Sequence, residues 1–557
     1  MSARGSILVS PMSLRPLMQA SFFDPTFLVP DCLESGSVAW LLARHRALLF
    51  PEWLFEGWRG ESRFGRSAWP APVLMTLLLL RWTEEGMSRL ASTRRAKTDV
   101  VWRAALGLCL RTQPPDEKTV REFEKFLRQR HPRCGIPRYL LFHEHVVRLC
   151  MNHDVVAEQP VWSMDSTPMW CYGAVLDTIR LLGDGTRSLL RDWSKAFKQP
   201  LRDLVEELNV AFASAKSTKG SFGIDWRDKE AVADVVDQLA SGALRVVEHI
   251  RKHLRAVRSN KHKSLLRSCR HLVKVVADDL ETDTQGRLVV ARGVAADRLI
   301  SMTDPNARHG RKSKTRTFNG FKIHALGDVV SGLIIALTVT HGNDHDGSVA
   351  HRLITRAKNL VEQIERVLAD TAYGGARLRH IVRYTEGVEI LAPPPAATST
   401  KPGRLGRRDI DFDFENRTAT CKAGVTTSAW SWVHNTKHGA KALRFKWSKN
   451  DCLECPLRAA CRGKQRGGHF VLLHPYEQEL RRARQAWEQP EVRQEYRVRT
   501  QVERLMNRVV RHGARQARAW GIGNCHLQAH LIATTCNLKL LAEALAAEEA
   551  ERNRVAA

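Results

Sequence analysis

The sequence lacks a hydrophobic run long enough to cross a membrane. The apolar stretch from Val73 to Leu80 ends at Arg81, whereas a membrane-spanning helix needs about 20 apolar residues. The N-terminal residues show no apolar core followed by a small-residue cleavage site, so we expect no signal peptide. There is also no repeat of fixed period and no Walker-type glycine loop with a lysine. These absences predict a soluble cytoplasmic protein.

Cysteine and acidic residues are both scarce. The 12 cysteines among 557 residues are too few for a disulfide scaffold. Asp and Glu total 59 against 87 Lys and Arg, which leaves a formal net charge of +28. So large a positive excess on a globular composition points to a polyanionic partner, most often nucleic acid. A membrane-surface protein is the rival interpretation, but no basic amphipathic anchor stands out.

Strand and helix signals alternate through the middle of the chain. We expect short strands at residues 161–165, 367–369 and 388–392, and a hairpin formed by 321–325 and 333–340 with its turn near 328–331. We expect helices within 36–130 and 186–275, at 349–367 and 376–385, and from 477 to the end. The order strand, helical insert, hairpin, helix, strand, helix, strand predicts an α/β fold with a mixed sheet.

Two basic segments are candidates for contact with DNA. Asp116 is expected to cap a helix that has Val120, Phe123 and Leu127 on one face. The other face carries a basic stripe of Lys118, Arg121, Lys125 and Arg128. Such a stripe suits a helix that reads DNA, and it equally suits the solvated face of a bundle helix. The second segment, residues 251–274, contains a run of Lys and Arg with no acid between them, and could neutralise several phosphates.

Three acidic residues, far apart in the sequence, are candidates for catalysis. Asp165 and Asp370 end two of the expected strands, where α/β proteins commonly bind ligands. Glu503 belongs to a helical segment in which Tyr496, Arg499 and Glu503 share one face. Two carboxylates 4 Å apart repel by about 4 kcal/mol at an effective dielectric near 20, so a cluster of them invites divalent cations. Loop chemistry for the aspartates, and an ion pair with a neighbouring arginine for Glu503, are the simpler alternatives.

Four cysteines give the strongest metal signal. Cys452-x2-Cys455 has the knuckle spacing of a tetrahedral thiolate site, with Cys461 after it and Cys421 before it. Four thiolates would form a closed structural Zn2+ site, and a redox pair is the alternative. The segment from His341 to Asp346 also contains several potential ligands, but Asn343 or Asp344 as a helix cap explains it more simply. His324 is expected to be a hydrogen-bonded structural residue.

Four stretches, in this order, resemble the DDE transposases of bacterial insertion sequences. Met164-Asp165-Ser166-Thr167 is similar to the family's first catalytic strand, and Ala369-Asp370-Thr371-Ala372-Tyr373-Gly374 to its second motif. The pattern Tyr496-x2-Arg499-x3-Glu503 resembles the third motif, a Tyr-x2-Arg-x3-Glu signature, and residues 451–461 resemble a Cys-knuckle insert of one branch. Residues 303–307, which precede the expected hairpin, also resemble a segment of this family. Together the motifs span about residues 161–541, and the N-terminal part resembles the family's end-binding region more loosely.

The resemblance implies an RNase H-like core in which Asp165, Asp370 and Glu503 are catalytic. Asp165 would bridge two Mg2+ (or Mn2+) ions, and the other two carboxylates would each complete one side. Tyr496 and Arg499 would contact DNA near the scissile phosphate. The signature's final Lys is expected at Val510, so its role could move to Arg511, unless the helix is wound differently there. A further row of arginines follows Glu503, although Gly513 could end its helix.

The implied function is that of a DNA transposase. It would bind the terminal inverted repeats of its element, cleave phosphodiester bonds and join the freed 3′ end to target DNA, as a homodimer or larger assembly in the bacterial nucleoid. A non-catalytic zinc-containing DNA-binding protein and a plain metal-dependent DNA nuclease are the alternatives. The expected domains, in chain order, are a helical DNA-end-binding domain (1–135), a linker helix with the first catalytic strand (136–180), a basic helical insert (181–300), the RNase H-like core (301–393), a linker with a four-cysteine zinc-knuckle insert (394–475), and C-terminal helices that complete the core (476–557).

Overall fold

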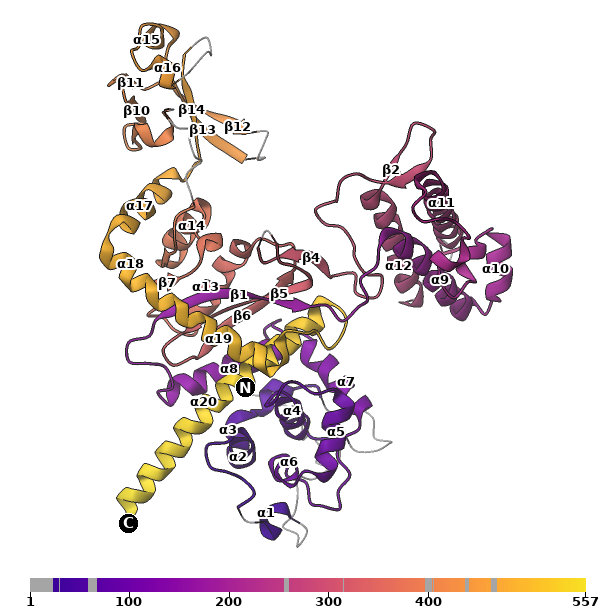
Figure 1. Ribbon diagram of the computed structural model, residues 1–557. Coiled ribbons are helices and arrows are strands. Elements are labelled where there is room, and N and C mark those ends of the chain that lie inside the picture. The colour runs from indigo at the N-terminus through magenta and orange to yellow at the C-terminus, as the bar shows by residue number, and fades with distance from the viewer. Residues whose placement is uncertain are drawn as a thin grey trace, which may run out of the picture.

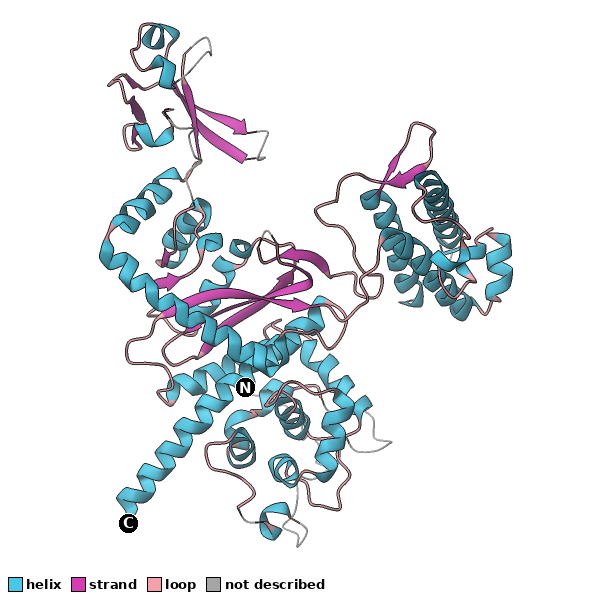
Figure 2. Ribbon diagram, in the orientation of Figure 1, coloured by secondary structure: helices cyan, strands magenta, loops and turns pink. Residues whose placement is uncertain are grey.

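The computed structural model describes residues 24–29, 31–58, 68–254, 260–313, 315–395, 403, 405–435, 440–461 and 468–557. A sheet lies at the centre, helices from the N-terminal part lie beside it, and two units project away from it (Figure 1). One of these units is mainly helical and the other is built largely from strands (Figure 2). Parts of the predicted segments lie outside the described residues: 1–23, 30 and 59–67 of the N-terminal domain, 255–259 of the basic segment, 314 of the core, and 396–402, 404, 436–439 and 462–467 of the linker and Cys-knuckle insert.

The central sheet is mixed. Its path is β4-β5-β1-β7-β8, and β6 also pairs with β5. The pairs β1–β5, β4–β5 and β5–β6 are antiparallel, whereas β1–β7 and β7–β8 are parallel. The strands are β1 (Trp162–Trp170), β4 (Arg308–Arg311), β5 (Thr317–Asp328), β6 (Ile334–His341), β7 (Arg366–Leu368) and β8 (Glu389–Leu391). The predicted mixed-sheet α/β fold is confirmed.

The predicted hairpin is formed by β5 and β6, and Asp328 closes its turn. The buried carboxylate of Asp328 accepts hydrogen bonds from the backbone N–H groups of Val330 and Ser331, and from that of Val161 before β1. Gly332 has a φ of +79°, in the left-handed region that residues with a side chain rarely adopt. One carboxylate therefore fixes both the turn and the entry of the neighbouring strand.

One predicted helix is shorter than expected. The helix expected at 349–367 is α13 (Ala350–Lys358), and the chain then passes through a loop into β7. The apolar residues that suggested a longer helix, Val361, Ile364 and Val367, are all buried in the core. These apolar side chains are therefore buried from a loop and a strand and not from a helix, while the loop residues between them are exposed. Burial of the side chain, and not helical periodicity, decides their positions.

The N-terminal helices share a continuous hydrophobic core with the sheet. Asp116 caps α7 by accepting a hydrogen bond from Thr119 N, as predicted. The helices are α1 (Pro25–Leu28), α2 (Val38–Arg44), α3 (Arg46–Leu49), α4 (Ala71–Leu80), α5 (Arg89–Thr98), α6 (Val100–Leu106), α7 (Glu117–Arg128) and α8 (Arg138–Asn152). The short 3-10 turn η2 (Glu52–Phe55) also belongs to this part. Further 3-10 turns lie in the two projecting units: η3 (Ala211–Ala213) and η4 (Lys219–Ser221) in the helical one, and η7 (Arg407–Asp409) in the strand-rich one.

Each projecting unit has a hydrophobic cluster of its own. The helical unit follows β1 and comprises α9 (Thr178–Phe197), α10 (Leu201–Glu207), α11 (Lys229–Leu254), α12 (Asn260–Asp279), β2 (Leu280–Thr282) and β3 (Leu288–Val290). The second unit contains two three-stranded sheets that the sequence analysis did not predict. It comprises β9 (Ile410–Asp413), β10 (Thr418–Cys421), β11 (Thr426–Thr427), β12 (Trp430–Asn435), β13 (Ala440–Lys446), α15 (Lys449–Leu453), α16 (Arg458–Cys461) and β14 (Phe470–Leu473).

The C-terminal segment returns to the sheet. It forms α17 (Glu477–Glu488), α18 (Pro490–Arg497), α19 (Val502–Val509) and α20 (Ile522–Ala556). Helix α19 lies against β1, and α20 lies against β6. The Asn537 side chain accepts a hydrogen bond from Ile334 N and donates one to Ile334 O, at 3.0 and 2.8 Å. No helix among the described residues is both long and apolar enough to cross a membrane.

Three histidines lie where α8 packs against α20. His143 Nδ1 is 3.1 Å from Thr534 Oγ1, and the rings of His143 and His530 are 5.8 Å apart. Burial lowers the pKa of His143 and of His526 to about 4, and it lowers the pKa of His530 well below its usual value. The folded protein therefore keeps this helix interface uncharged at neutral pH.

We predict that acid destabilises the protein through these histidines. The unfolded chain takes up their protons near pH 6.5, whereas the folded chain resists protonation until about pH 4. The free energy of unfolding therefore falls as the pH decreases from about 6.5 towards 4, by up to about 1.4 kcal/mol per pH unit for each histidine. Urea unfolding across this range should show a shallower pH dependence for His526→Gln, with the exposed His434→Gln as the control. Equal slopes for His526→Gln and the unaltered protein would contradict this prediction.

Candidate active site

Asp165 and Asp370 lie side by side on neighbouring parallel strands. Asp165 is inside β1, which continues to Trp170 and does not end at Asp165 as predicted, whereas Asp370 comes shortly after the end of β7. Ser163 of β1 pairs with Leu368 of β7, and each aspartate follows two residues later. Asp165 Oδ1 accepts a hydrogen bond from Ser166 N at 2.8 Å. Asp370 accepts one from Ala372 N at 2.9 Å and so caps the short turn η6 (Thr371–Tyr373). The structure therefore brings two of the three predicted acids together.

The pKa of the Asp165 carboxyl is raised. Burial is the main cause, and the negative charges of Asp370 and Asp346 raise it further, while Arg499 and the bond from Ser166 N lower it. A positive charge placed between this carboxyl and the neighbouring carboxylates would stabilise its ionised form.

Asp346 is a third carboxylate of this cluster, and the sequence analysis did not select it. It accepts hydrogen bonds from Ser166 Oγ at 2.8 Å and from Lys322 Nζ at 2.6 Å. Burial acts to raise its pKa, but Lys322 and the neighbouring donors outweigh burial and hold the pKa below its usual value. The available signal was its place in the acid- and histidine-rich segment after the hairpin.

The helix-cap explanation of that segment was wrong. His345 caps the short turn η5 (Asp346–Ser348), and α13 begins without a side-chain cap. Asp344 instead accepts a hydrogen bond from His341 N, and Asn343 donates one to Ala296 O. These local bonds hold the loop that presents Asp346 to Ser166.

Tyr373 and His324 form a buried, uncharged hydrogen-bonded pair next to the carboxylates. The Tyr373 hydroxyl is 3.0 Å from His324 Nδ1, and His324 Nε2 is 2.9 Å from Thr340 Oγ1. Burial lowers the pKa of His324 to about 4. Burial, together with the nearby aspartates, raises the pKa of Tyr373 well above its usual value. The prediction that His324 is a hydrogen-bonded structural residue is confirmed.

Arg499 and Tyr496 connect the C-terminal segment to β1 and to the residue that follows β7. Arg499 Nη2 lies 3.5 Å from Asp165 Oδ2, and the Tyr496 hydroxyl donates a hydrogen bond to Ala369 O at 3.0 Å. Burial raises the pKa of Tyr496. Both predicted DNA-contacting residues thus have protein partners beside the aspartates, and their contact with DNA stays a prediction.

Glu503 lies on the same segment but apart from the aspartate cluster. It is exposed near the start of α19, four residues after Arg499, and makes no hydrogen bond or ion pair with the described residues. The expected single helix is interrupted, because the 3-10 turn η8 (Val498–Gln501) separates α18 from α19. Thr500 Oγ1 donates to Arg497 O in this turn, a local bond that competes with regular helix. The structure therefore does not join Glu503 to Asp165 or Asp370.

The helix after Glu503 is wound differently from a regular α-helix. Residues Val510–Ala514 form the π-helical segment η9, and Gly513 has a φ of +94° with backbone atoms of Glu85 and Gly86 close to it. The departure from helical backbone angles is at His512 and Gly513, after Arg511, so the winding does not bring Arg511 to the place of Val510, and the basic role of Arg511 stays a prediction. Arg511 is exposed. The row of arginines does not form one face, because Arg508 donates to Gly332 O.

The basic stripe of α7 is largely exposed. Lys118, Arg121 and Lys125 are exposed, and Arg128 is half-buried. Lys125 forms an ion pair with Glu122 at 2.7 Å, which reduces the charge available to a phosphate. The predicted apolar face is buried. Both interpretations of the stripe, DNA contact and a solvated face, remain compatible with this helix.

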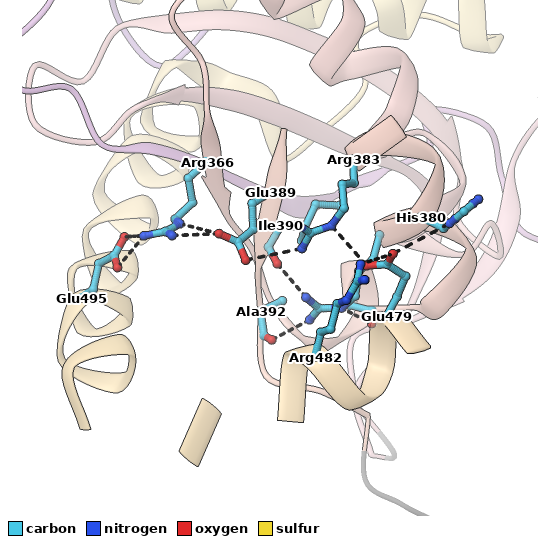
Figure 3. Close-up of polar contacts among 11 residues, drawn as sticks. Arg366, His380, Arg383, Glu389, Ile390, Ala392, Glu479, Arg482 and Glu495 are labelled. Carbon is cyan, nitrogen blue, oxygen red and sulfur yellow. Dashed lines mark hydrogen bonds and ion pairs between the residues drawn. The ribbon is translucent and has the colours of Figure 1, made fainter. Parts of the chain in front are cut away.

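An ion-pair network holds α17 and α18 against the edge of the sheet (Figure 3). Arg366 of β7 donates to both carboxylate oxygens of Glu495, at 2.9 and 2.8 Å, and also pairs with Glu389 of β8. Glu479 of α17 is buried and lies 3.2 Å from Arg383 of α14 (Ala376–Glu386). Because Glu495 directly precedes Tyr496, this network helps to align the segment that reaches Asp165. Its partners are too far apart in the sequence for spacing to reveal them.

The four predicted zinc ligands lie in the strand-rich projecting unit. Cys421 ends β10, Cys452 and Cys461 belong to α15 and α16, and Cys455 lies between these helices. Cys421, Cys455 and Cys461 line one small cavity, and both Cys421 and Cys452 pack against the unit's hydrophobic cluster. Across the described part of the chain, no group of three or more His, Cys, Asp or Glu side chains is arranged to hold a metal ion.

We predict that Tyr496→Phe lowers the free energy of unfolding by about 0.5–1.5 kcal/mol, because it removes the hydrogen bond to Ala369 O. Urea unfolding measures this loss. Tyr172→Phe, which removes an exposed hydroxyl, is the control and should leave stability unchanged. Equal stabilities of the Tyr496→Phe protein and the unaltered protein would show that the bond contributes nothing.

Comparison with known proteins gives one family. Residues 420–542 match the model of the transposase DDE domain. The matched region includes the four cysteines, Tyr496, Arg499 and Glu503, and it begins after Asp165 and Asp370. Neither the curated proteins nor the solved structures gave a match. The match at residues 420–542 supports a DDE-type transposase.

Proposed function

We propose that this protein is a DNA transposase with an RNase H-like core. It binds the terminal inverted repeats of its element, cleaves phosphodiester bonds and transfers the freed strand to target DNA. The observation that carries the proposal is the pairing of Ser163 with Leu368, which sets Asp165 beside Asp370. The family match in the C-terminal part of the chain supports the same reaction class.

The carboxylate donor set formed around Asp165 and Asp370 suits hard divalent cations. Carboxylate oxygens are the ligands that Mg2+ prefers, and the raised pKa of Asp165 reflects, besides burial, neighbouring carboxylates that a cation would neutralise. Asp165, Asp370 and Glu503 would hold the ions. Bound Mg2+ or Mn2+ supplies activation of a water or 3′-hydroxyl and stabilisation of the leaving oxygen. Glu503 would have to turn towards the aspartates from its exposed position.

Side chains of the C-terminal segment would orient the DNA. In this proposal Arg499 exchanges its contact with Asp165 for a scissile-strand phosphate, to which a guanidinium can bind through two hydrogen bonds. The ring of Tyr496 would contact the same DNA strand, and Arg511 would provide a further positive charge. Lys118, Arg121, Lys125 and Arg128 of α7 would contact the backbone of the terminal repeat. Two ends processed together would require at least a homodimer.

We predict that Asp165→Ala reduces Mn2+-dependent nicking of terminal-repeat DNA by more than about 100-fold, since even partners that only orient metal ligands contribute 10- to 100-fold. Binding of the same DNA should persist, because the phosphate-contacting cations are unchanged. Gel assays of nicking and fluorescence anisotropy of binding measure the two effects. Asp203→Ala, which alters an exposed aspartate of the helical unit, is the matched control.

Three outcomes separate the candidate functions. Nicking that survives Asp165→Ala would remove Asp165 from the catalytic site. Cutting without joining to a target plasmid would identify a plain nuclease. Binding of terminal repeats without any cutting by the unaltered protein would identify a non-catalytic DNA-binding protein.

We further propose that Cys421, Cys452, Cys455 and Cys461 hold a structural Zn2+. The cavity shared by three of these thiols supports this assignment. A bound zinc would stabilise a unit whose own hydrophobic cluster is small.

We predict about one zinc per chain in the purified protein, as four thiolates form one closed site. Cys455→Ser should lower the zinc content strongly and destabilise the strand-rich unit. Cys134→Ser, at an exposed cysteine in the N-terminal part, should change neither. Metal analysis by mass spectrometry measures the ratio, and a ratio near zero in the unaltered protein would reject the site.

A further inference from the structure

A cavity of about 570 Å³ lies between the strand-rich unit and the core. Its walls come from β12 and β13 on one side, and from α14 and the start of α17 on the other. In Figure 1 the strands of this unit stand beyond α14 and α17. The volume falls within the roughly 300–1,000 Å³ of sites that bind small organic groups. We call this cavity the aromatic cleft.

The wall from the strand-rich unit is one face of a β-ribbon. Trp430 and Trp432 are two residues apart on β12, so their side chains point to the same face. They pair across the ribbon with Phe445 and Leu443 of β13, and all four line the cleft. Trp432 is 53 % exposed. A large indole is therefore held on a regular strand with much of its ring open to solvent.

The opposite wall is also aromatic. The His380 ring stacks on Tyr476 with centroids 4.1 Å apart, and it lies 4.4 Å from Tyr384 at a tilt. Tyr384 is 63 % exposed. His380 is anchored at 3.8 Å from Glu479, beside the network of Figure 3. Exposed aromatic rings thus face the same space from two separate parts of the chain.

The charge of the aromatic cleft favours an anion. Arg417 lies over the Trp430 ring, 4.5 Å from its centroid, and Lys441 is on the same face of β13 as Leu443. Among the described residues that line the cleft, Glu479 is the one carboxylate. It is 3 % exposed and forms ion pairs with Arg383 and Arg482, so its charge is neutralised. Aromatic faces with cations beside them bind unpaired nucleotides, whose bases stack while their phosphates pair.

We propose that the aromatic cleft binds unpaired nucleotides of a DNA strand, with a base stacked against Trp432 or Tyr384 and a phosphate near Arg417 and Lys441. A base inside a duplex is already covered on both faces, so the cleft selects single-stranded or unpaired DNA. Helix α14, which carries Tyr384, begins six residues after Asp370. Tyr384 therefore lies on the helix that follows the turn capped by Asp370. The inference rests on the proposed function in that it takes DNA as the partner.

Binding of a labelled oligothymidylate tests this proposal. We would use about 10 nucleotides, within the ~4–16 that single-stranded sites cover, and measure fluorescence anisotropy with the full-length protein. Trp432→Ala and Tyr384→Ala should each weaken binding by about 5- to 100-fold, as expected for loss of one stacked base. Trp432→Phe should retain most of the affinity. Binding should also quench tryptophan fluorescence, and Trp432→Ala should remove most of that quenching.

Phe470→Ala is the matched control. Phe470 of β14 is 50 % exposed and pairs with Lys446, so it lies on the face of the same sheet opposite to Phe445 and the cleft. The Phe470→Ala substitution removes a comparable aromatic side chain from the same unit and should leave oligothymidylate binding unchanged. Full affinity in both Trp432→Ala and Tyr384→Ala, or an equal loss in Phe470→Ala, would overturn the proposal.

The outcome is separable from that of the proposed function. Oligothymidylate binding that depends on Trp432, in a protein that neither nicks nor joins terminal-repeat DNA, would support the cleft and reject the transposase mechanism. The protein could instead nick and join terminal-repeat DNA while its oligothymidylate binding is insensitive to Trp432→Ala and Tyr384→Ala. That result would support the transposase mechanism and reject the cleft.

Discussion

Electrostatic repulsion among buried carboxylates is the constraint on which the centre of this protein depends. The parallel register of β1 and β7 sets Asp165 beside Asp370, and the loop before α13 adds Asp346. Three negative groups in one partly buried place are unfavourable unless positive charge is near them. The chain supplies part of that charge through Lys322, which pairs with Asp346, and Arg499, which approaches Asp165. A site that attracts cations is the chemical consequence of this imbalance.

The C-terminal segment completes this centre through long-range contacts. Arg366 holds Glu495, the Tyr496 hydroxyl holds the backbone just before Asp370, and Arg499 reaches Asp165. All three contacts join the C-terminal segment to residues of β1 and β7, or just after β7, that are more than 120 positions away in the sequence. The position of the last catalytic candidate, Glu503, is therefore set by how this segment docks and not by the helix that contains it. This explains why Glu503 can lie exposed while its neighbours four and seven residues earlier are engaged.

The sequence was most informative where local chemistry decides the structure. The hairpin, the cap at Asp116 and the strand that ends before Asp370 follow from turn residues, capping residues and short apolar runs, and each has its expected place. The strand with Asp165 was also expected, but it continues to Trp170 because its pairing with β5 extends that far. It was least informative where tertiary packing decides. Apolar spacing suggested a helix through Val361 and Ile364, which instead belong to a loop and have their side chains buried in the core. Asp346 was not selected because its partners, Ser166 and Lys322, are distant in the sequence. The two small sheets of the Cys-bearing unit were missed, since short strands between polar residues carry little periodic signal.

The contact between Asn537 and Ile334 affects how copies of this protein can associate. Strand β6 is at the margin of the sheet, where unbonded peptide groups normally offer a template to another chain. The side-chain amide of Asn537, on the long C-terminal helix α20, forms hydrogen bonds with both the backbone N–H and the backbone C=O of Ile334. Continuation of the sheet from one molecule into the next is therefore disfavoured at this point, and protein molecules gathered on one DNA would have to meet through other surfaces.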